Sequence, residues 1–281
     1  MTTATDPDPA TDTDAATAGA AIDTAGAALT RMRAACPLVH CITNYVAMTT
    51  AANAVLAAGA SPAMVHAAEE SGDVARIAGA LTINIGTLSE HWLDGMVAAA
   101  HGATAAGVPW VLDPVAHFVS PWRREATARL MALRPAIVRG NASEIIALAG
   151  AEAAGQGADS GDDVAAAEGP ARALARETGA VVAVTGLRDF VTDGARAVRV
   201  SGGHALMPKV TALGCALTAL TGAYAAQESA FDAAAAALAH YAAAGERAGA
   251  AATQPGSFAV AFLDALAAVG PSDLESRVAA A

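Results

Sequence analysis

The fold is decided by the stretch LTINIGTLSEHWLDGMVAAAHGATAAGVPWVLDP, residues 81–114. Two short apolar runs, Leu81–Ile85 and Trp110–Leu112, enclose a longer run that is typical of a helix, His91–Ala106. A strand followed by a helix and a second strand predicts a crossover unit, in which the two strands lie parallel in one sheet. The stretch therefore predicts an α/β fold.

The same alternation extends in both directions from this unit. Further strands are predicted at Pro37–Ile42, Ala63–His66, Ala136–Val138 and Val181–Thr185. Further helices are predicted at Thr49–Ala58, Glu70–Ala78, Arg123–Leu133, Ser143–Leu148 and Ala171–Thr178. The strands Phe190–Thr192 and Ala197–Val200 surround Asp193-Gly194, which predicts a hairpin at one edge of the sheet. From Cys215 onward we expect almost only helix.

Two segments lack the bulky apolar residues that a packed core needs. Residues 1–24 are mainly Thr, Ala, Asp and Pro, which predicts a disordered N-terminal tail. Gly150 to about Gly169 is rich in Gly, Ala and Asp, which predicts a surface loop with a helix starting near Asp162. We expect residues 25–281 to form a single domain.

The composition argues against several classes of protein. The net charge is −11 and there is no basic stripe, so nucleic acid is not an expected partner. No run of about 18 strongly apolar residues is present, so we expect no membrane span. The first residues show no basic region followed by an apolar run, so we expect no signal peptide, and three cysteines without regular spacing do not suggest a disulfide framework. These features predict a cytoplasmic location.

Four successive predicted strands end in polar or glycine-bearing turns. These turns contain Asn84 and Gly86, Asp113-Pro114, Arg139-Gly140-Asn141, and Thr185-Gly186. Each turn alone is ordinary turn chemistry. Because open α/β sheets bind ligands outside the carboxyl ends of their strands, four in series predict an enzyme site along that edge.

A fifth turn, Lys209-Val-Thr-Ala-Leu-Gly-Cys215, leads into a helix and contains the only lysine of the chain. The first N–H groups of a helix lack internal acceptors and lie at the positive end of the helix dipole, so they can bind an anion. Phosphoryl transfer needs such a site. The turn alone is a weak signal, and taken by itself it favours a plain helix start.

Several segments together resemble the hydroxyethylthiazole kinase family, a branch of the ribokinase-like fold. They are Pro37–Val46, Ala58–Met64, Ile77–Leu88, Leu112–Val115, Arg139–Ile145, Val184–Gly186 and Lys209–Cys215. They occur in the family's order and spacing, over roughly residues 27–265. The resemblance implies a three-layer sandwich with a mainly parallel central sheet between helices. It also implies ATP-dependent phosphorylation of 4-methyl-5-(2-hydroxyethyl)thiazole in thiamine salvage.

The resemblance implies roles for individual residues. It places Met64, Asn44 and Ala212 on the thiazole side, although Met64 also suits core packing and Asn44 suits a turn. It assigns four residues to ATP, namely Arg139, Thr185, Thr211 and Gly214. An arginine fork suits phosphate oxygens, although a surface salt bridge is the alternative for Arg139.

The resemblance also implies a Mg²⁺ site and a catalytic cysteine. Asp113, Asn141 and Glu144 match the metal-side positions, although Asn141 and Glu144 also fit a helix-capping pair. Cys215 takes the place of the base found in most ribokinase-like enzymes. A helix N-terminus would favour its thiolate, although a buried structural cysteine is the alternative and its role as a base stays open.

Three features depart from the family pattern. Ala212 stands where glycine is usual, which strains the turn if this residue needs a positive φ. The bulky stretch Ala116–Trp122 replaces a glycine-rich one, and Leu187 replaces a common acidic residue. Two alternatives therefore stay open: a paralogue that phosphorylates another small heterocyclic alcohol, and a non-catalytic thiazole-binding protein. The resemblance further implies a homotrimer with sites at subunit interfaces.

Overall fold

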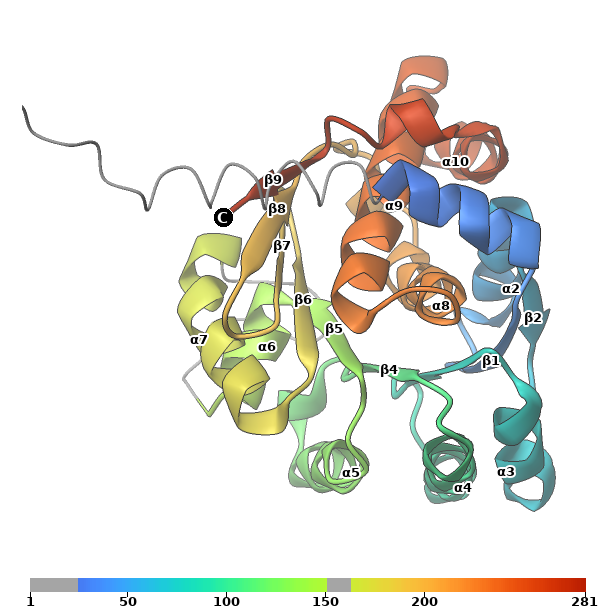
Figure 1. Cartoon of the computed structure of the whole chain (residues 1–281), viewed down its shortest axis with the longest axis vertical. Coiled ribbons are helices and arrows are strands. Elements are labelled where there is room, and N and C mark those ends of the chain that lie inside the picture. Colours follow the sequence, from blue (N-terminus) through green and yellow to red (C-terminus); the bar gives the residue numbers. More distant parts are fainter. Residues whose placement is uncertain (1–24, 151–162) are drawn as a thin grey trace, which may run out of the picture.

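A nine-stranded sheet forms the centre of the computed structural model, which describes residues 25–150 and 163–281. The strand order is β2-β1-β3-β4-β5-β6-β7-β8-β9 (Figure 1). The strands from β2 through β6 in this order pair in parallel, and β7, β8 and β9 continue the sheet antiparallel. The expected α/β fold with a mainly parallel sheet is confirmed.

The boundaries of the elements are close to those predicted from the sequence. The strands are β1 (Leu38–Ile42), β2 (Ser61–Ala63), β3 (Ala80–Asn84), β4 (Trp110–Asp113), β5 (Ile137–Asn141), β6 (Val181–Thr185), β7 (Asp189–Thr192), β8 (Ala197–Val200) and β9 (Val278–Ala280). The α-helices are α2 (Met48–Ala58), α3 (Ala68–Ile77), α4 (Glu90–Ala106), α5 (Pro121–Met131), α6 (Ala142–Leu148), α7 (Val164–Thr178), α8 (Leu213–Ala225), α9 (Ala230–Ala251) and α10 (Pro255–Ala268). A further helix covers residues 25–35, and short 3-10 helices are η1 (His117–Val119), η2 (Met207–Lys209) and η3 (Pro271–Asp273).

Helices cover both faces of the sheet, which gives three layers (Figure 1). On one face, α8 packs on β1, β3 and β4, and α9 packs on β5 to β8, with α2 and α10 behind them. On the other face lie α3, α4, α5, α6 and α7. Strands that are buried on both faces read as apolar runs, which explains why the parallel strands were recognisable in the sequence.

Small side chains let α8 and α9 lie close to the sheet and to each other. Every residue from 233 to 245 in α9 is buried, and most of them are alanine. A Cβ added at Gly222 of α8 would collide with Thr82 of β3, so only glycine allows this approach. His240 of α9 is also buried, where Nδ1 pairs with Tyr224 Oη at 2.9 Å and Nε2 donates to the Leu266 carbonyl.

Several predictions about the elements were wrong in detail. The strand predicted at Ala63–His66 lies two residues earlier, because β2 pairs with β1 from Ser61 to Ala63. The hairpin of β7 and β8 exists, but it is not at the edge, because β9 pairs with β8. This strand also interrupts the helical last third of the chain.

The loop predicted from Gly150 to Gly169 lies partly outside the described residues, as does the tail predicted at residues 1–24. The helix start predicted near Asp162 is confirmed, because α7 begins at Val164. The side chain of Asp163 accepts a hydrogen bond from the N–H of Ala165 and caps this helix.

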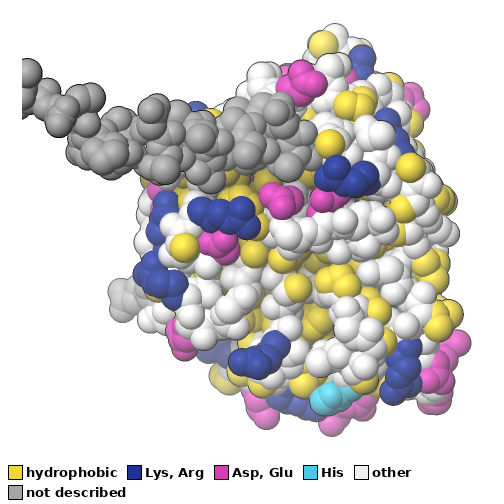
Figure 2. All heavy atoms as spheres, viewed as in Figure 1, with side chains coloured by type: hydrophobic (Ala, Val, Ile, Leu, Met, Phe, Trp, Pro, Cys, Tyr) yellow, Lys and Arg dark blue, Asp and Glu magenta, His cyan; other side chains and the backbone are white. Residues whose placement is uncertain are grey.

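The surface of the described residues carries charges of both signs. On the face shown in Figure 2, the basic and acidic side chains are interspersed and form no continuous basic patch. Within the described ranges, no helix is both long and apolar enough to cross a membrane.

Candidate active site

Polar side chains gather at the carboxyl ends of five neighbouring strands, β1, β3, β4, β5 and β6. The chain leaves β1 toward one edge of the sheet to form β2 and then crosses to β3 on the other side. Such a switch point between β1 and β3 is where open α/β sheets form ligand crevices. Asn44 follows β1 and Asn84 ends β3, so both lie at this point.

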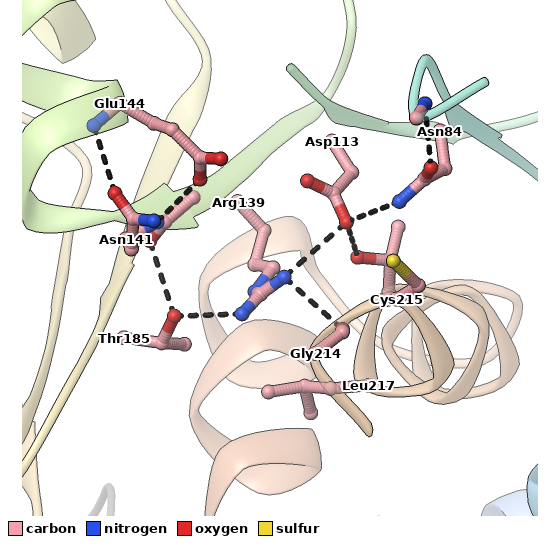
Figure 3. A network of polar contacts seen from close by, with 12 residues as sticks. Asn84, Asp113, Arg139, Asn141, Glu144, Thr185, Gly214, Cys215 and Leu217 are labelled. Atoms are coloured by element: carbon pink, nitrogen blue, oxygen red, sulfur yellow. Dashed lines mark hydrogen bonds and ion pairs between the residues drawn. The ribbon is translucent and has the colours of Figure 1, made fainter. Parts of the chain in front are cut away.

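One continuous hydrogen-bond network links these strand ends, and Figure 3 shows its part from Asn84 to Thr185. Asn44 Nδ2 donates to Asn84 Oδ1 at 2.8 Å, and Asn84 Nδ2 donates to Asp113 Oδ2 at 2.7 Å. Arg139 Nη1 donates to the same Asp113 oxygen at 3.2 Å, and Arg139 Nη2 donates to Thr185 Oγ1 at 2.7 Å. The network fixes side chains from sequence positions 141 residues apart relative to one another.

Asp113 is the centre of this network and is fully buried. Oδ2 accepts a third hydrogen bond, from Thr218 Oγ1 of α8 at 2.7 Å. Burial raises the pKa of Asp113, while Arg139 and the hydrogen bonds from Thr218 and Asn84 oppose this shift. In the described part of the chain, Asp113 Oδ1 and Arg139 Nε are buried without a hydrogen-bond partner. Both atoms are therefore available to a ligand or to water.

Arg139 connects this network to the start of α8. Nη1 also donates to the Gly214 carbonyl at 3.0 Å. Burial lowers the pKa of Arg139, but Asp113 and Glu144 more than offset this effect, so the guanidinium remains charged. The alternative of a surface salt bridge is excluded, because Arg139 is only 8% exposed.

Asn141 and Glu144 form a capping box at the start of α6. Glu144 N–H donates to Asn141 Oδ1 at 2.9 Å, and Asn141 N–H donates to Glu144 Oε2 at 2.8 Å. Glu144 Oε1 accepts the N–H of Ala116 at 2.9 Å. Burial, reinforced by Asp113, raises the pKa of Glu144 to about 7. The capping alternative is therefore realised, whereas the metal role of this pair stays a prediction.

The turn before α8 has the positive φ at Ala212 that would strain an alanine. Ala212 has φ 67° and ψ −2°, in the left-handed region where glycine is preferred. Thr211 and Gly214 are exposed, and the N–H groups of the first helical residues lack intrahelical acceptors. Tyr241 Oη donates to the Leu213 carbonyl at 2.5 Å and fixes the turn from α9.

Cys215 lies next to the network but is not a thiolate. Asn44 Nδ2 donates to its sulfur at 3.3 Å. Burial, reinforced by the nearby Asp113 carboxylate, raises the pKa of Cys215 to about 11. Burial and the neighbouring carboxylate thus oppose the thiolate that the helix N-terminus was expected to favour.

A cavity of about 590 Å³ opens beside the start of α8. Its polar end contains Arg139, Thr185 and Gly214, and apolar side chains such as Leu217 and Met207 line the rest. Asn44 and Met64, which were predicted to bind thiazole, are not part of this lining. Met64 follows β2, is half-buried and packs against the core.

Arg123 holds two loops of the site together and was not predicted as a functional residue. Its guanidinium donates to the carbonyls of Ile85 and Gly86 after β3, at 2.7 and 3.0 Å. It also donates to Val115 and Ala116 after β4, at 2.5 and 3.2 Å. Ala116 has φ 48°, so a second left-handed alanine lies in this bulky loop. Arg123 thereby holds the bulky loop Ala116–Trp122 against the end of β3.

The structure brings together most of the predicted site residues. Asp113, Arg139, Thr185 and Cys215 are joined directly or through shared partners. Sequence reasoning did not assign a role to Asn84 or Thr218, which donate to Asp113. Asn84 could have been noticed as a polar residue in the mainly apolar run Leu81–Ile85. No feature of the sequence marks Thr218.

A family model described as "Hydroxyethylthiazole kinase family" matches residues 29–271. A hydroxyethylthiazole kinase from Rhizobium johnstonii is 65% identical over 256 residues, which cover 90% of this chain and 96% of the relative. One from Cereibacter sphaeroides is 63% identical over 254 residues, which cover 90% of this chain and 97% of the relative.

Solved structures agree with these sequence relatives. A hydroxyethylthiazole kinase structure from Pyrococcus horikoshii superposes with a TM-score of 0.84 at 38% identity, covering 92% of this chain and 98% of that one. A pyridoxal kinase from Staphylococcus aureus, in complex with ADP, superposes with a TM-score of 0.55 at 17% identity, covering 75% and 88%. The second likeness shows only the shared fold, and together they confirm the ribokinase-like three-layer architecture.

Proposed function

Because the chain belongs to the hydroxyethylthiazole kinase family, we propose that it transfers the γ-phosphoryl group of ATP to the hydroxyl of 4-methyl-5-(2-hydroxyethyl)thiazole in thiamine salvage. The observation that carries the proposal is the network from Asn44 to Thr185, which ends on the N-terminal turn of α8. This arrangement offers buried cationic and N–H donors where charge accumulates during phosphoryl transfer.

The polar end of the cavity is the proposed site for the ATP phosphates. Arg139 supplies a fixed positive charge, and Thr185 supplies a hydroxyl. The free N–H groups around Gly214, together with exposed Thr211, form the anion site at the helix start. The apolar remainder of the cavity suits the rest of the nucleotide.

The acceptor alcohol is proposed to lie on the other side of the same turn, near Asn44, Met64 and Ala212. Cys215 then lies between the two substrates as a neutral thiol and helps position the hydroxyl. A strong base is not required, because the transition state of phosphoryl transfer is largely dissociative. As the new phosphorus–oxygen bond forms and the bond between the γ-phosphorus and ADP breaks, the hydroxyl proton becomes acidic and passes to water or to an oxygen of the transferred phosphate.

The residues present fit Mg²⁺ that is shared with ATP rather than held in a protein cage. Within the described ranges, no group of three or more His, Cys, Asp or Glu is placed to hold a metal ion. Asp113 nevertheless has a buried oxygen without a partner, and its carboxylate raises the pKa of Glu144. Asp113, Glu144 and Asn141 are the proposed metal-side residues, largely through water. When bound, Mg²⁺ would neutralise charge on the β- and γ-phosphates.

A homotrimer with sites at subunit interfaces is proposed on two observations. Asn44 and Met64 lie outside the cavity, so the proposed thiazole side is separate from it, and the family resemblance places that side against a neighbouring subunit. Their neighbours Tyr45 and Val46 are 64% and 59% exposed, which is unusual for apolar side chains beside a site. Light scattering at several protein concentrations tests the assembly, and a monomer at all concentrations would contradict it.

A coupled assay of ADP release, with and without Mg²⁺, tests the function. Wild-type protein should phosphorylate hydroxyethylthiazole only with Mg²⁺, and Arg139→Ala should lower kcat/KM by about 10²–10³-fold. Arg129→Ala, at an exposed position of α5, is the matched control and should keep activity. Turnover of a different heterocyclic alcohol in a substrate panel would favour the paralogue. Thiazole binding by calorimetry without any turnover would favour the non-catalytic protein.

A further inference from the structure

Asp189 is an acidic residue in the cavity whose role is not explained by the network. It is the first residue of β7, and the pairing of Val184 with Phe190 places it opposite Thr185 of β6. The tight turn Gly186–Arg188 connects the two strands, and Gly186 N–H donates to Asp189 Oδ1 at 2.9 Å. Asp189 therefore closes this turn beside the polar end of the cavity.

The second carboxylate oxygen of Asp189 is available to a ligand. Among the described residues, Oδ2 has no hydrogen-bond partner, and Asp189 lines the cavity. The nearest arginines do not pair with it: Arg139 donates to Asp113, Gly214 and Thr185, and Arg188 donates to Ser201. An ionised carboxylate only accepts hydrogen bonds, so its partner must be a donor from the ligand or from water.

The parts of a nucleoside triphosphate differ in what they can offer this oxygen. Phosphate groups are negatively charged acceptors, so they would be repelled by it. In the proposed ATP site, the apolar lining around Leu217 and Met207 suits the base. The sugar lies next to the phosphates, and its hydroxyl groups are donors. A carboxylate that lies opposite Thr185 on the neighbouring strand is therefore best placed to accept a hydrogen bond from the sugar.

We propose that Asp189 accepts a hydrogen bond from a ribose hydroxyl of the phosphoryl donor, so the protein prefers ribonucleotides to deoxyribonucleotides. This inference rests on the proposed ATP site. The electrostatics agree with it, because burial raises the pKa of Asp189 to about 7 and only Gly186 N–H and the more distant Arg139 oppose this. A hydroxyl donor from the ligand would favour the charged form.

The test measures kcat/KM with ATP, 2′-deoxy-ATP and 3′-deoxy-ATP for wild type, Asp189→Asn and Asp189→Ala. Asparagine keeps an acceptor for Gly186 N–H, so Asp189→Asn separates ribose recognition from support of the turn. Wild type should prefer ATP by about tenfold or more over at least one analogue, and both variants should lose most of this preference. Asp193→Asn, in the turn at the far end of the same hairpin, is the matched control and should keep the wild-type ratio.

Two kinetic results would overturn the proposal. One is a wild type that uses ATP and both analogues equally well. The other is a pair of variants that lose activity equally with all three nucleotides, because Asp189 would then serve only the turn. If wild type turns over no nucleotide, the proposed function fails, and calorimetry with ADP and its two deoxy analogues tests the ribose contact. A wild-type preference that Asp189→Asn abolishes would support the contact, and equal binding would overturn it.

Discussion

Replacing Ala212 by glycine should stabilise the protein, which is the reverse of the usual effect of glycine. Ala212 has φ 67° and forms no side-chain capping bond at the start of α8. Its Cβ therefore adds steric strain without a compensating contact from a cap. Glycine adopts the same backbone conformation without that strain.

The expected gain is small but measurable. A left-handed conformation costs a non-glycine residue about 1–2 kcal/mol. Glycine loses about 0.5–1 kcal/mol more conformational entropy on folding than alanine. The difference between the middle values of these two ranges predicts that Ala212→Gly raises the free energy of unfolding by about 0.75 kcal/mol. For a chain of this size, this corresponds to an increase in Tm of roughly 1–4 °C.

Urea and thermal unfolding of Ala212→Gly measure this gain, with Ala128→Gly as the control. Ala128 is exposed inside α5, where glycine should lower the free energy of unfolding by about 1 kcal/mol. Opposite signs for the two variants would support the reasoning. A loss at Ala212 as large as that at Ala128 would refute it. Activity should be retained in Ala212→Gly, because the turn keeps its backbone geometry.

Four further predictions concern the site. Arg139→Ala should lower the free energy of unfolding by about 3–5 kcal/mol, because it leaves the Asp113 carboxylate buried without its cation; a loss below about 1 kcal/mol in urea unfolding would contradict this. Arg123→Ala should reduce kcat, and it should lower the free energy of unfolding by about 2 kcal/mol or more, because the carbonyls of two loops lose their donor. An unchanged kcat in the coupled assay would show that activity does not depend on these hydrogen bonds. The pKa of Cys215 is about 11, so its alkylation by iodoacetamide should accelerate about tenfold per pH unit from pH 7 to 10. Mass spectrometry of the peptide that contains Cys215 measures the rate, and a plateau by pH 8 would be inconsistent with a raised pKa. The pKa of Asp189 is raised to about 7 in the folded state, so between about pH 4 and 7 the unfolded chain binds fewer protons and stability falls as pH rises. From pH 5 to 8, wild type should therefore lose more free energy of unfolding than Asp189→Asn. Urea unfolding measures both proteins, and equal losses would rule this out.

The parallel strands of the fold were predictable because their signals are local. The run from Leu81 to Ile85 is apolar and short, and the polar residue after each strand marks where the chain turns. β9 was not predictable, because three residues at Val278–Ala280 become a strand only by pairing with β8, about 80 residues earlier. β2 has the same length, and its position depends on β1 in the same way.

The site was predictable in its members but not in its connections. Arg139 and Asp113 could be proposed from strand ends, whereas their shared partner Thr218 lies 105 residues from Asp113 on a helix face. The acidity of Cys215 was judged from its place at a helix start. In the structure, burial and the Asp113 carboxylate decide it, and neither is visible along the chain.

The buried alanines of α9 restrict how this protein can change over evolutionary time. Apart from Tyr241 and Ala242, which line the cavity, the residues from 233 to 245 are packed between the sheet, α8 and α10, so an added methyl group has little space to occupy. Drift in this helix should therefore exchange small residues for one another, and larger ones should arise only with paired changes in the facing strands. Libraries that aim to alter substrate range should leave α9 fixed and diversify the strand-end turns.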